Sequence, residues 1–194
     1  MIYPEPDTIR RFLQEIVPEP PERSGLVRAA VLIPLIAGDR EYSFLFTERS
    51  KAVEHHKGQI SFPGGVCDPP EEDPVIAALR EMEEEVGIPP ACVCVMGTMN
   101  EFWTPTGFQI TPVVGIIAKL PPLKIQQNEV ASVFTVPFSF FSDPANVRVE
   151  QRVVEGTRRE IYYYDYGSHT IWGATAMMLR GFLKTIRCLG QEML

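Results

Sequence analysis

The sequence predicts an α+β fold in which helices cover a mixed β-sheet. Strand-like segments bounded by Gly, Pro and Asp recur along most of the chain, and only a few helical segments interrupt them. The composition also indicates a folded protein: 45% of the 194 residues are hydrophobic and 22% are charged. Such a chain can bury a sizeable core, which excludes a disordered, collagen-like or low-complexity protein.

The first predicted element is a short amphipathic helix over residues 7–17. Its apolar residues are spaced for one face of a helix: Ile9, Phe12, Leu13 and Ile16. A run of prolines that begins at Pro18 ends it. We expect this helix and a Pro-rich connector to make up residues 1–24, as an appendage to one main domain of residues 25–194.

Seven strand-like segments follow, separated by residues that favour turns. They are residues 29–36, 42–47, 92–97, 110–118, 130–136, 147–154 and 160–165. Interleaved with few helices, these segments favour a single sheet with both parallel and antiparallel pairs.

The segment at residues 74–86 carries helix signals at both ends. Asp73 is a good N-cap, Pro74 occupies the favoured first helical position, and Gly87 supplies the stop. Apolar residues at steps of four, three and four predict a buried stripe: Val75, Leu79, Met82 and Val86. A second, longer helix rich in Ala, Met and Leu is predicted for residues 173–189.

Charge and hydropathy exclude several classes of protein. The 18 Lys and Arg against 25 Asp and Glu give a net charge of −7, which argues against broad electrostatic binding to nucleic acid or to an anionic membrane. The longest apolar stretch, residues 29–37, is shorter than the roughly 18 apolar residues of a membrane helix. No secretory or mitochondrial signal is visible at the N-terminus, so we expect a cytoplasmic protein.

The four cysteines form neither a zinc-binding nor a disulfide pattern. We expect them to be small buried hydrophobic residues, with two of them on one face of a strand. They are Cys67, Cys92, Cys94 and Cys188.

Acidic residues crowd the end of the helix at residues 74–86. Residues 83–85 are all Glu, and acids near a helix C-terminus oppose the macrodipole by roughly 0.3 to 1 kcal/mol each. Glu81 and Glu85 also repel each other at positions i and i+4. Such a cluster is either a solvated acidic face or a site for Mg²⁺, which prefers carboxylate oxygens. The Gly-rich residues 58–65 upstream favour the second interpretation, because their backbone can approach a metal and an anionic substrate closely.

The region from Gly65 to residue 88 resembles the signature of the Nudix hydrolases, G-x5-E-x7-R-E-U-x-E-E-x-G-U, where U is aliphatic. Residues 80–88 (REMEEEVGI) match every specified position, whereas six residues instead of five separate Gly65 from Glu72. The resemblance implies a Nudix fold, an α/β/α sandwich around a central mixed sheet. It also implies Mg²⁺ or Mn²⁺ as cofactor and hydrolysis of a nucleoside diphosphate linked to another moiety.

The same resemblance implies roles for individual residues. Glu81 and Glu85 match the principal metal ligands of the family, Glu84 assists the metal or orients water, and Arg80 holds the loop by pairing with Glu72. Glu129 precedes an apolar strand and is a strand-start residue, a further ligand or the general base. The candidate catalytic residues are thus Glu84, Glu81, Arg80 and Glu129, and the candidate metal ligands are Glu81, Glu85, Glu84 and Glu72.

Residues 45–50 (LFTERS) and 58–65 (GQISFPGG) resemble the motif of the coenzyme A pyrophosphatase subgroup, L-L-T-x-R-S-x3-R-x3-G-x3-F-P-G-G. Phe46 replaces the second Leu, and Glu54 replaces the second Arg. The resemblance covers most of residues 28–180. It implies cleavage of coenzyme A into 3′,5′-ADP and 4′-phosphopantetheine. The alternatives are a Nudix pyrophosphatase for ADP-ribose or dinucleotides, and a Nudix sensor that binds nucleotide without turnover.

Basic and imidazole side chains flank the Gly-rich loop: Arg49, Lys51, His55, His56 and Lys57. Their place beside the loop favours contact with substrate phosphates over a merely solvated cluster. We expect substrate contacts from Arg49, Lys57, Gly64 and Gly65, and Phe108 either joins the core or stacks on adenine. The expected partner is a small nucleotide, and the sequence leaves open whether the chain is a monomer or a homodimer.

Overall fold

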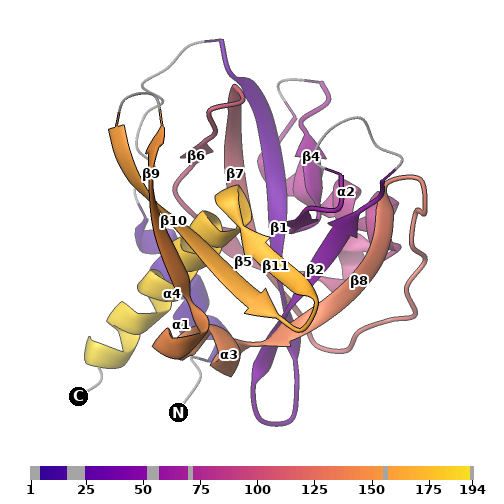
Figure 1. The fold of residues 1–194 in the computed structure, drawn as a ribbon. Helices are drawn as coiled ribbons and strands as arrows, with labels where there is room; N and C mark the ends of the chain where they lie inside the picture. Colours follow the sequence, from indigo (N-terminus) through magenta and orange to yellow (C-terminus); the bar gives the residue numbers. More distant parts are fainter. Residues whose placement is uncertain (1–4, 17–24, 52–56, 70–71, 155–156, 193–194) are drawn as a thin grey trace.

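The computed structural model describes residues 5–16, 25–51, 57–69, 72–154 and 157–192, and Figure 1 shows their fold. These residues form layers around a large mixed sheet. Helix α2 (Pro74–Val86) covers one face of this sheet, and helices α1 (Pro6–Glu15) and α4 (Gly173–Glu192) lie on the other. The predicted α+β fold with a central mixed sheet is therefore confirmed.

The large sheet contains eight strands in the described part of the chain. They are β1 (Val27–Ala37), β2 (Tyr42–Arg49), β3 (Ile60–Ser61), β4 (Gly64–Val66), β5 (Cys94–Thr98), β6 (Phe102–Trp103), β7 (Phe108–Ile117) and β8 (Val130–Pro137). The main order is β3-β2-β1-β7-β5, while β4 pairs with β1, β6 with β7, and β8 with β2. The sheet is mixed because β1 and β7 run parallel and the other pairs run antiparallel.

A second, antiparallel sheet has the order β11-β10-β9 in the described residues. Its strands are β9 (Arg148–Val154), β10 (Thr157–Tyr166) and β11 (His169–Trp172). Between the two sheets the chain forms α3 (Phe138–Ser142) and a 3-10 turn at Pro144–Asn146. Tyr164 and Ile171 of this sheet belong to the same core as α1 and α4, so the second sheet closes that side of the molecule.

Strand β1 separates two hydrophobic cores. Ala30 and Leu32 pack in the core under α2, whereas Ile33 and Leu35 pack in the core shared by α1, α4 and the second sheet. Because side chains alternate between the faces of a strand, a strand covered on both faces is apolar almost continuously. This explains the long apolar run that begins at residue 29.

Helix α1 is more closely integrated than an appendage. Its Ile9 and Leu13 are buried in the core that α4 covers, and α1 lies against β5. A Cβ atom on Gly97 of β5 would lie 2.8 Å from the Cβ of Leu13, so the absence of a side chain lets the helix approach the strand. The division at residues 1–24 and 25–194 stays a prediction.

Several short elements were not predicted, because segments of two to five residues are too short to show a hydrophobic period. These are the strands β3, β4, β6 and β11 and the helix α3. The expectation for the cysteines is wrong in two cases. A 3-10 turn at Pro90–Cys92 delays the start of β5, and Cys92 and Cys94 are exposed, whereas Cys67 is buried as expected. The side chain of Cys188 lies outside the described ones.

None of the helices described here is long and apolar enough to cross a membrane.

Helix α2 has the ends that the sequence predicts. The Asp73 side chain accepts a hydrogen bond of 2.8 Å from the Val75 N–H, and Gly87 adopts the left-handed conformation with φ of 75°. Beyond the helix, the N–H groups of Lys124 and Gln126 donate to the carbonyls of Val86 and Glu85, respectively, each at 2.9 Å. The segment after β7 thus satisfies carbonyls that the helix end leaves free.

We predict that Gly87→Ala destabilises the protein by about 2 to 5 kcal/mol. A left-handed conformation costs a residue with a Cβ roughly 1 to 2 kcal/mol, and overpacking adds about 1 to 3 kcal/mol. The overpacking is expected because the new Cβ would lie 2.6 Å from the Lys124 Cβ. Urea unfolding measures both effects. Gly167→Ala is the matched control, because Gly167 also has a positive φ but a Cβ added there would meet no atom within 4 Å. Its destabilisation should therefore be close to the cost of the left-handed conformation alone.

Candidate functional site

The Gly-rich loop is fixed by contacts at successive residues. The Phe62 ring stacks on Phe46 at a centroid distance of 4.8 Å, and the carbonyl of Pro63 accepts a 2.8 Å hydrogen bond from the Leu32 N–H. Gly64 and Gly65 then pair with Val31 and Ala30 of β1, respectively. The loop is therefore an extension of the central sheet, in which Gly65 faces helix α2 and Gly64 faces β1.

Gly65 lies directly against an acidic side chain of α2. A Cβ atom at this position would lie 2.5 Å from both the Cδ and the Oε1 of Glu81. Only a residue without a side chain permits this approach. The pKa of the Glu81 carboxyl is raised, first because the group is partly buried, and then because Glu84 and Glu129 are negatively charged; Arg80 opposes the shift.

Arg80 joins the loop before α2 to the acids of the helix. Its Nε and Nη2 atoms each donate to one oxygen of Glu72 at 3.2 Å, and its Nη1 donates to Glu81 at 2.7 Å and to Glu84 at 3.0 Å. Nη2 also donates to the Val66 carbonyl at 3.0 Å. The expected ion pair between Arg80 and Glu72 is therefore present, although the loop is one residue longer than in the general signature.

Glu72 has little freedom left in this arrangement. Besides both bonds from Arg80, its Oε2 accepts a 2.8 Å hydrogen bond from the Asp68 N–H. These hydrogen bonds lower the pKa of the Glu72 carboxyl, the one from Arg80 most strongly. The backbone groups of Val66 and Asp68 were absent from the sequence prediction, because a carbonyl or an N–H group carries no signal in residue identity.

Glu85 is the most buried acid of the site, with 4% of its surface exposed. Burial raises the pKa of its carboxyl to about 8, and the charge of Glu81 contributes to the rise, while Arg49 and a backbone hydrogen bond from Gly64 oppose it. The Oε2 atom of Glu85 is buried and has no hydrogen-bond partner, and the same holds for the Nε atom of Arg49. Buried polar atoms normally find a partner, so this corner is incomplete as it stands.

Arg49 and Glu129 reach the acids from other elements. Arg49 is the last residue of β2, where the pairing with β8 is irregular. Glu129 precedes β8, and its carbonyl accepts a 2.7 Å hydrogen bond from the Ser50 N–H. Because the charge of Glu129 affects the pKa of both Glu81 and Glu85, it lies near them.

The donor set suits a hard divalent cation. Carboxylate oxygens are the ligands that Mg²⁺ and Mn²⁺ prefer, the unpaired Glu85 oxygen needs a positive partner, and the missing side chain of Gly65 lets the Glu81 carboxylate lie against the loop. In the described residues, no three His, Cys, Asp or Glu side chains already form a group that could hold a metal. Glu72, Glu81 and Glu84 are each hydrogen-bonded to Arg80 instead.

No described contact links two of the predicted substrate-binding residues, Phe108 and Lys57, to the acidic residues of the site. Phe108 begins β7 and pairs with Val27 of β1, whereas Gly65 pairs with Ala30 of the same strand. Val27 and Ala30 are three strand positions apart, so Phe108 and Gly65 are separated by roughly 10 Å along β1. Lys57 is exposed in the turn before β3. Lys51 is exposed at the end of the described segment before the loop, whereas Glu54, His55 and His56 lie outside the described residues.

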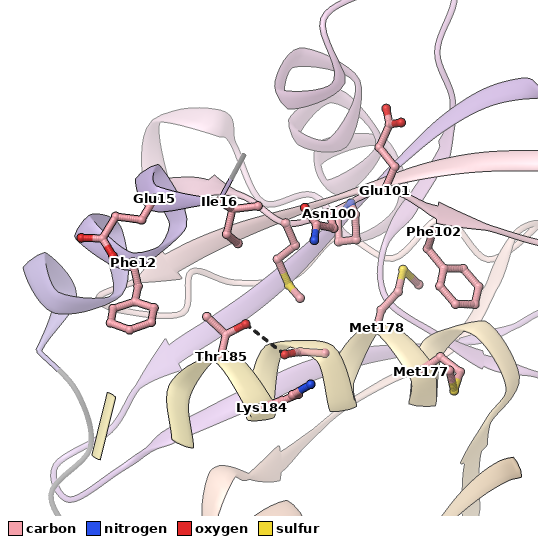
Figure 2. Close-up of a pocket in the computed structure, with 13 residues that line it drawn as sticks. Phe12, Glu15, Ile16, Asn100, Glu101, Phe102, Met177, Met178, Lys184 and Thr185 are labelled. Carbon is pink, nitrogen blue, oxygen red and sulfur yellow. Dashed lines mark hydrogen bonds between the residues drawn. The ribbon is translucent and has the colours of Figure 1, made fainter. Parts of the chain in front are cut away.

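A pocket of about 600 Å³ lies elsewhere, between α1, the β5–β6 connection and α4 (Figure 2). Its walls are mostly apolar and include Phe12, Ile16, Met99, Phe102, Met177 and Met178. None of the residues that the sequence predicted for the site lines it. It opens on the α4 side of the large sheet, whereas the acids lie on the α2 side.

Comparisons with known proteins agree with this geometry. The NUDIX domain model matches residues 26–155. The chain is 35% identical over 184 residues to Nudix hydrolase NudL of Photorhabdus laumondii, which covers 93% of this chain and 97% of the relative. It is 37% identical over 153 residues to NudL of Escherichia coli K12, which covers 79% of each chain.

Solved structures show the same fold. A MutT/nudix family protein from Enterococcus faecalis aligns with a TM-score of 0.54 at 16% identity, covering 87% of this chain and 65% of that one. The Nudix hydrolase RenU from M. smegmatis aligns with a TM-score of 0.51 at 22% identity, covering 62% of this chain and 84% of that one. Together with the family match over residues 26–155, this shows that the chain belongs to the Nudix hydrolase family and is an enzyme of the pyrophosphatase type.

Proposed function

We propose that this Nudix hydrolase cleaves the pyrophosphate of coenzyme A and its derivatives into 3′,5′-ADP and 4′-phosphopantetheine. One observation carries the proposal: the two separate halves of the subgroup motif, residues 45–50 and 58–65, form one hairpin. Thr47 pairs with Ser61 and Glu48 with Ile60, and the N–H of Arg49 donates to the Gln59 carbonyl at 2.9 Å. The two halves of the motif therefore lie side by side, and the second half ends at Gly65, which lies against Glu81.

Each residue of the site has a physical task in this proposal. Glu81 and Glu85, with Glu84, would hold the divalent cation, and Arg80 is a positioning residue that fixes the helix against the loop. When bound, Mg²⁺ or Mn²⁺ neutralises the phosphates and makes a water more acidic. The bare backbone of Gly64 and Gly65 lets the pyrophosphate come close to the acids.

The reaction is an in-line attack of water on phosphorus that expels a phosphate ester. Arg49 can donate its free Nε–H to the anionic substrate, since no protein atom accepts that hydrogen. Glu129 remains a candidate for a further ligand or for the general base that takes the proton of the attacking water. Both Glu72 oxygens are engaged by Arg80, so its expected role as a ligand would require it to release one of them.

A sensor without turnover is a weaker alternative. A protein that only binds nucleotide has no need to bury Glu85 without a partner, and an unpaired buried group is costly. An enzyme that binds a cation at each turnover has that need.

We predict that Glu81→Gln lowers turnover by roughly 10²-fold or more, because charge stabilisation of the transition state is lost. Above the Glu85 pKa of about 8, where both acids are charged, the thermal stability of the metal-free protein should stay equal or rise slightly. The reason is that Gln can still accept the hydrogen bond from Arg80, while the repulsion between Glu81 and Glu85 disappears. Steady-state kinetics with Mg²⁺ and melting in EDTA measure the two effects. Glu83→Gln is the matched control, because Glu83 is exposed on the same helix and should retain activity. Near-normal activity of Glu81→Gln would reject the assignment.

We predict that the metal-free protein loses stability between pH 5 and pH 8 because of Glu85. Its pKa is about 8 in the folded chain and roughly 4.5 in the unfolded chain. Between these two pKa values the folded state keeps a proton on Glu85 that the unfolded state has lost, so the free energy of unfolding falls as the pH rises. The contribution of Glu85 to stability is therefore complete below the pKa of the unfolded chain and is lost as the pH rises through the pKa of the folded chain. Glu85→Gln should abolish this loss, and urea unfolding in EDTA at several pH values measures it. A parent and a variant with parallel profiles would contradict the prediction.

We predict that kcat/KM decreases in the order CoA, dephospho-CoA, ADP-ribose at matched Mg²⁺. Cationic donors that hold the 3′-phosphate contribute roughly 1.5 to 3 kcal/mol, so loss of this phosphate should lower kcat/KM about ten- to a hundredfold. Lys57→Gln should narrow the difference between CoA and dephospho-CoA, whereas the exposed Lys119→Gln should not. Product separation for each substrate gives the rates. ADP-ribose as the best substrate would discard the CoA proposal and leave the pyrophosphatase chemistry intact.

A further inference from the structure

Strand β9 forms an open edge of the second sheet. It pairs with β10, and within the described residues no strand pairs with its other side. Two apolar side chains on it are exposed, Val149 at 46% and Val153 at 69%. A strand of seven residues with exposed valines, whose outer edge pairs with no described strand, is a template for pairing with another chain, unless charges or a bulge prevent it.

The charges on this edge alternate in sign. Arg148, Glu150 and Arg152 share one face of β9, and Val149, Gln151 and Val153 share the other. Within one chain Glu150 already accepts hydrogen bonds from Arg148 and Arg152, the latter at 2.9 Å from Nη2. Both guanidinium groups also lie over the Tyr163 ring, at 4.2 Å and 5.8 Å from its centroid. These contacts hold the charged side chains in place along the open edge.

Symmetry restricts how two copies of β9 can pair. In an antiparallel pair related by a two-fold axis, opposite residues point to the same face, so the axis must pass through a residue and not between two residues. An axis at Glu150 would place Glu150 opposite itself and Arg148 opposite Arg152. An axis at Arg152 would place Arg152 opposite itself. Both arrangements bring like charges together, which destabilises cross-strand pairs.

An axis at Gln151, the middle residue of β9, aligns all seven residues of the strand, whereas an axis at Val149 or at Val153 would align only three. Val149 then faces Val153 of the second copy, and Glu150 faces Arg152 of the second copy; by symmetry each pair occurs twice. Arg148 faces Val154 of the second copy, so the exposed valines become covered, two Glu–Arg pairs form and no like charges lie opposite each other, as is typical of a self-complementary interface.

We propose that two copies of this chain dimerise by antiparallel pairing of their β9 strands about a two-fold axis at Gln151. The two small sheets then form one continuous sheet across the dimer. Figure 1 shows β9 and α2 on opposite sides of the molecule, so the acidic site stays open in each copy. The proposal does not depend on which pyrophosphate the enzyme cleaves.

Charge reversal tests the pairing. Sedimentation velocity over a range of concentrations should show a dimer for the parent protein. Glu150→Arg and Arg152→Glu should each raise the dissociation constant roughly tenfold or more, because each brings like charges opposite one another. The double variant with both changes should regain dimerisation, since the pairs form again with reversed signs. Circular dichroism and melting check that each variant is folded.

A cysteine placed on the axis tests the register. Gln151→Cys faces its own copy, so mild oxidation should link two chains through residue 151, as peptide mapping can establish despite the exposed Cys92 and Cys94. Val149→Cys is the matched control, because it faces residue 153 and should not link to itself. A parent that is monomeric at every concentration, a dimer that tolerates both single reversals, or equal linking of the two cysteine variants would each overturn the proposal.

Discussion

The arrangement of the site depends on the guanidinium group of Arg80, which binds three carboxylates. Four of the five residues from Glu81 to Glu85 are acidic, and their mutual repulsion would push the end of α2 away from the loop. Arg80 prevents this, because its guanidinium group binds Glu72, Glu81, Glu84 and the Val66 carbonyl at once. A planar group with five donors can do this, whereas a lysine has three donors at a single point. Arg80 therefore fixes the loop and the helix as one unit.

Much of this unit could be predicted from the sequence, because its signals are local. The caps of α2 at Asp73 and Gly87 follow from residue type and position, and the pairing of Arg80 with Glu72 follows from the resemblance to the family. The burial of Glu85 could not be predicted in this way. Glu85 lies beside the buried Met82 and Val86 because of the way the helix packs on the sheet. The spacing of the apolar residues along the helix does not predict this packing.

Contacts between distant segments were the hardest part to predict. Arg49 reaches the acids because β2 pairs with β3 and so ends beside the Gly-rich loop, and no spacing within one segment gives this information. The integration of α1 is a similar case, since its apolar face predicts burial but not the partner. For Phe108, the register of β7 gives its distance from the Gly-rich loop but not its role, so the expectation that it joins the core or stacks on adenine stays a prediction.

Strand β1 both holds the Gly-rich loop and fills the two cores, so the evolution of stability is linked to that of activity. Neighbouring residues of this one strand pair with the glycines that meet the acids and also fill the two cores. A change of volume at Leu32 or Ile33 would therefore shift the backbone on which Gly64 and Gly65 rest. Adaptation to a new temperature through these cores would alter the catalytic loop as well, so substitutions at exposed positions outside both cores are the ones that can change stability independently.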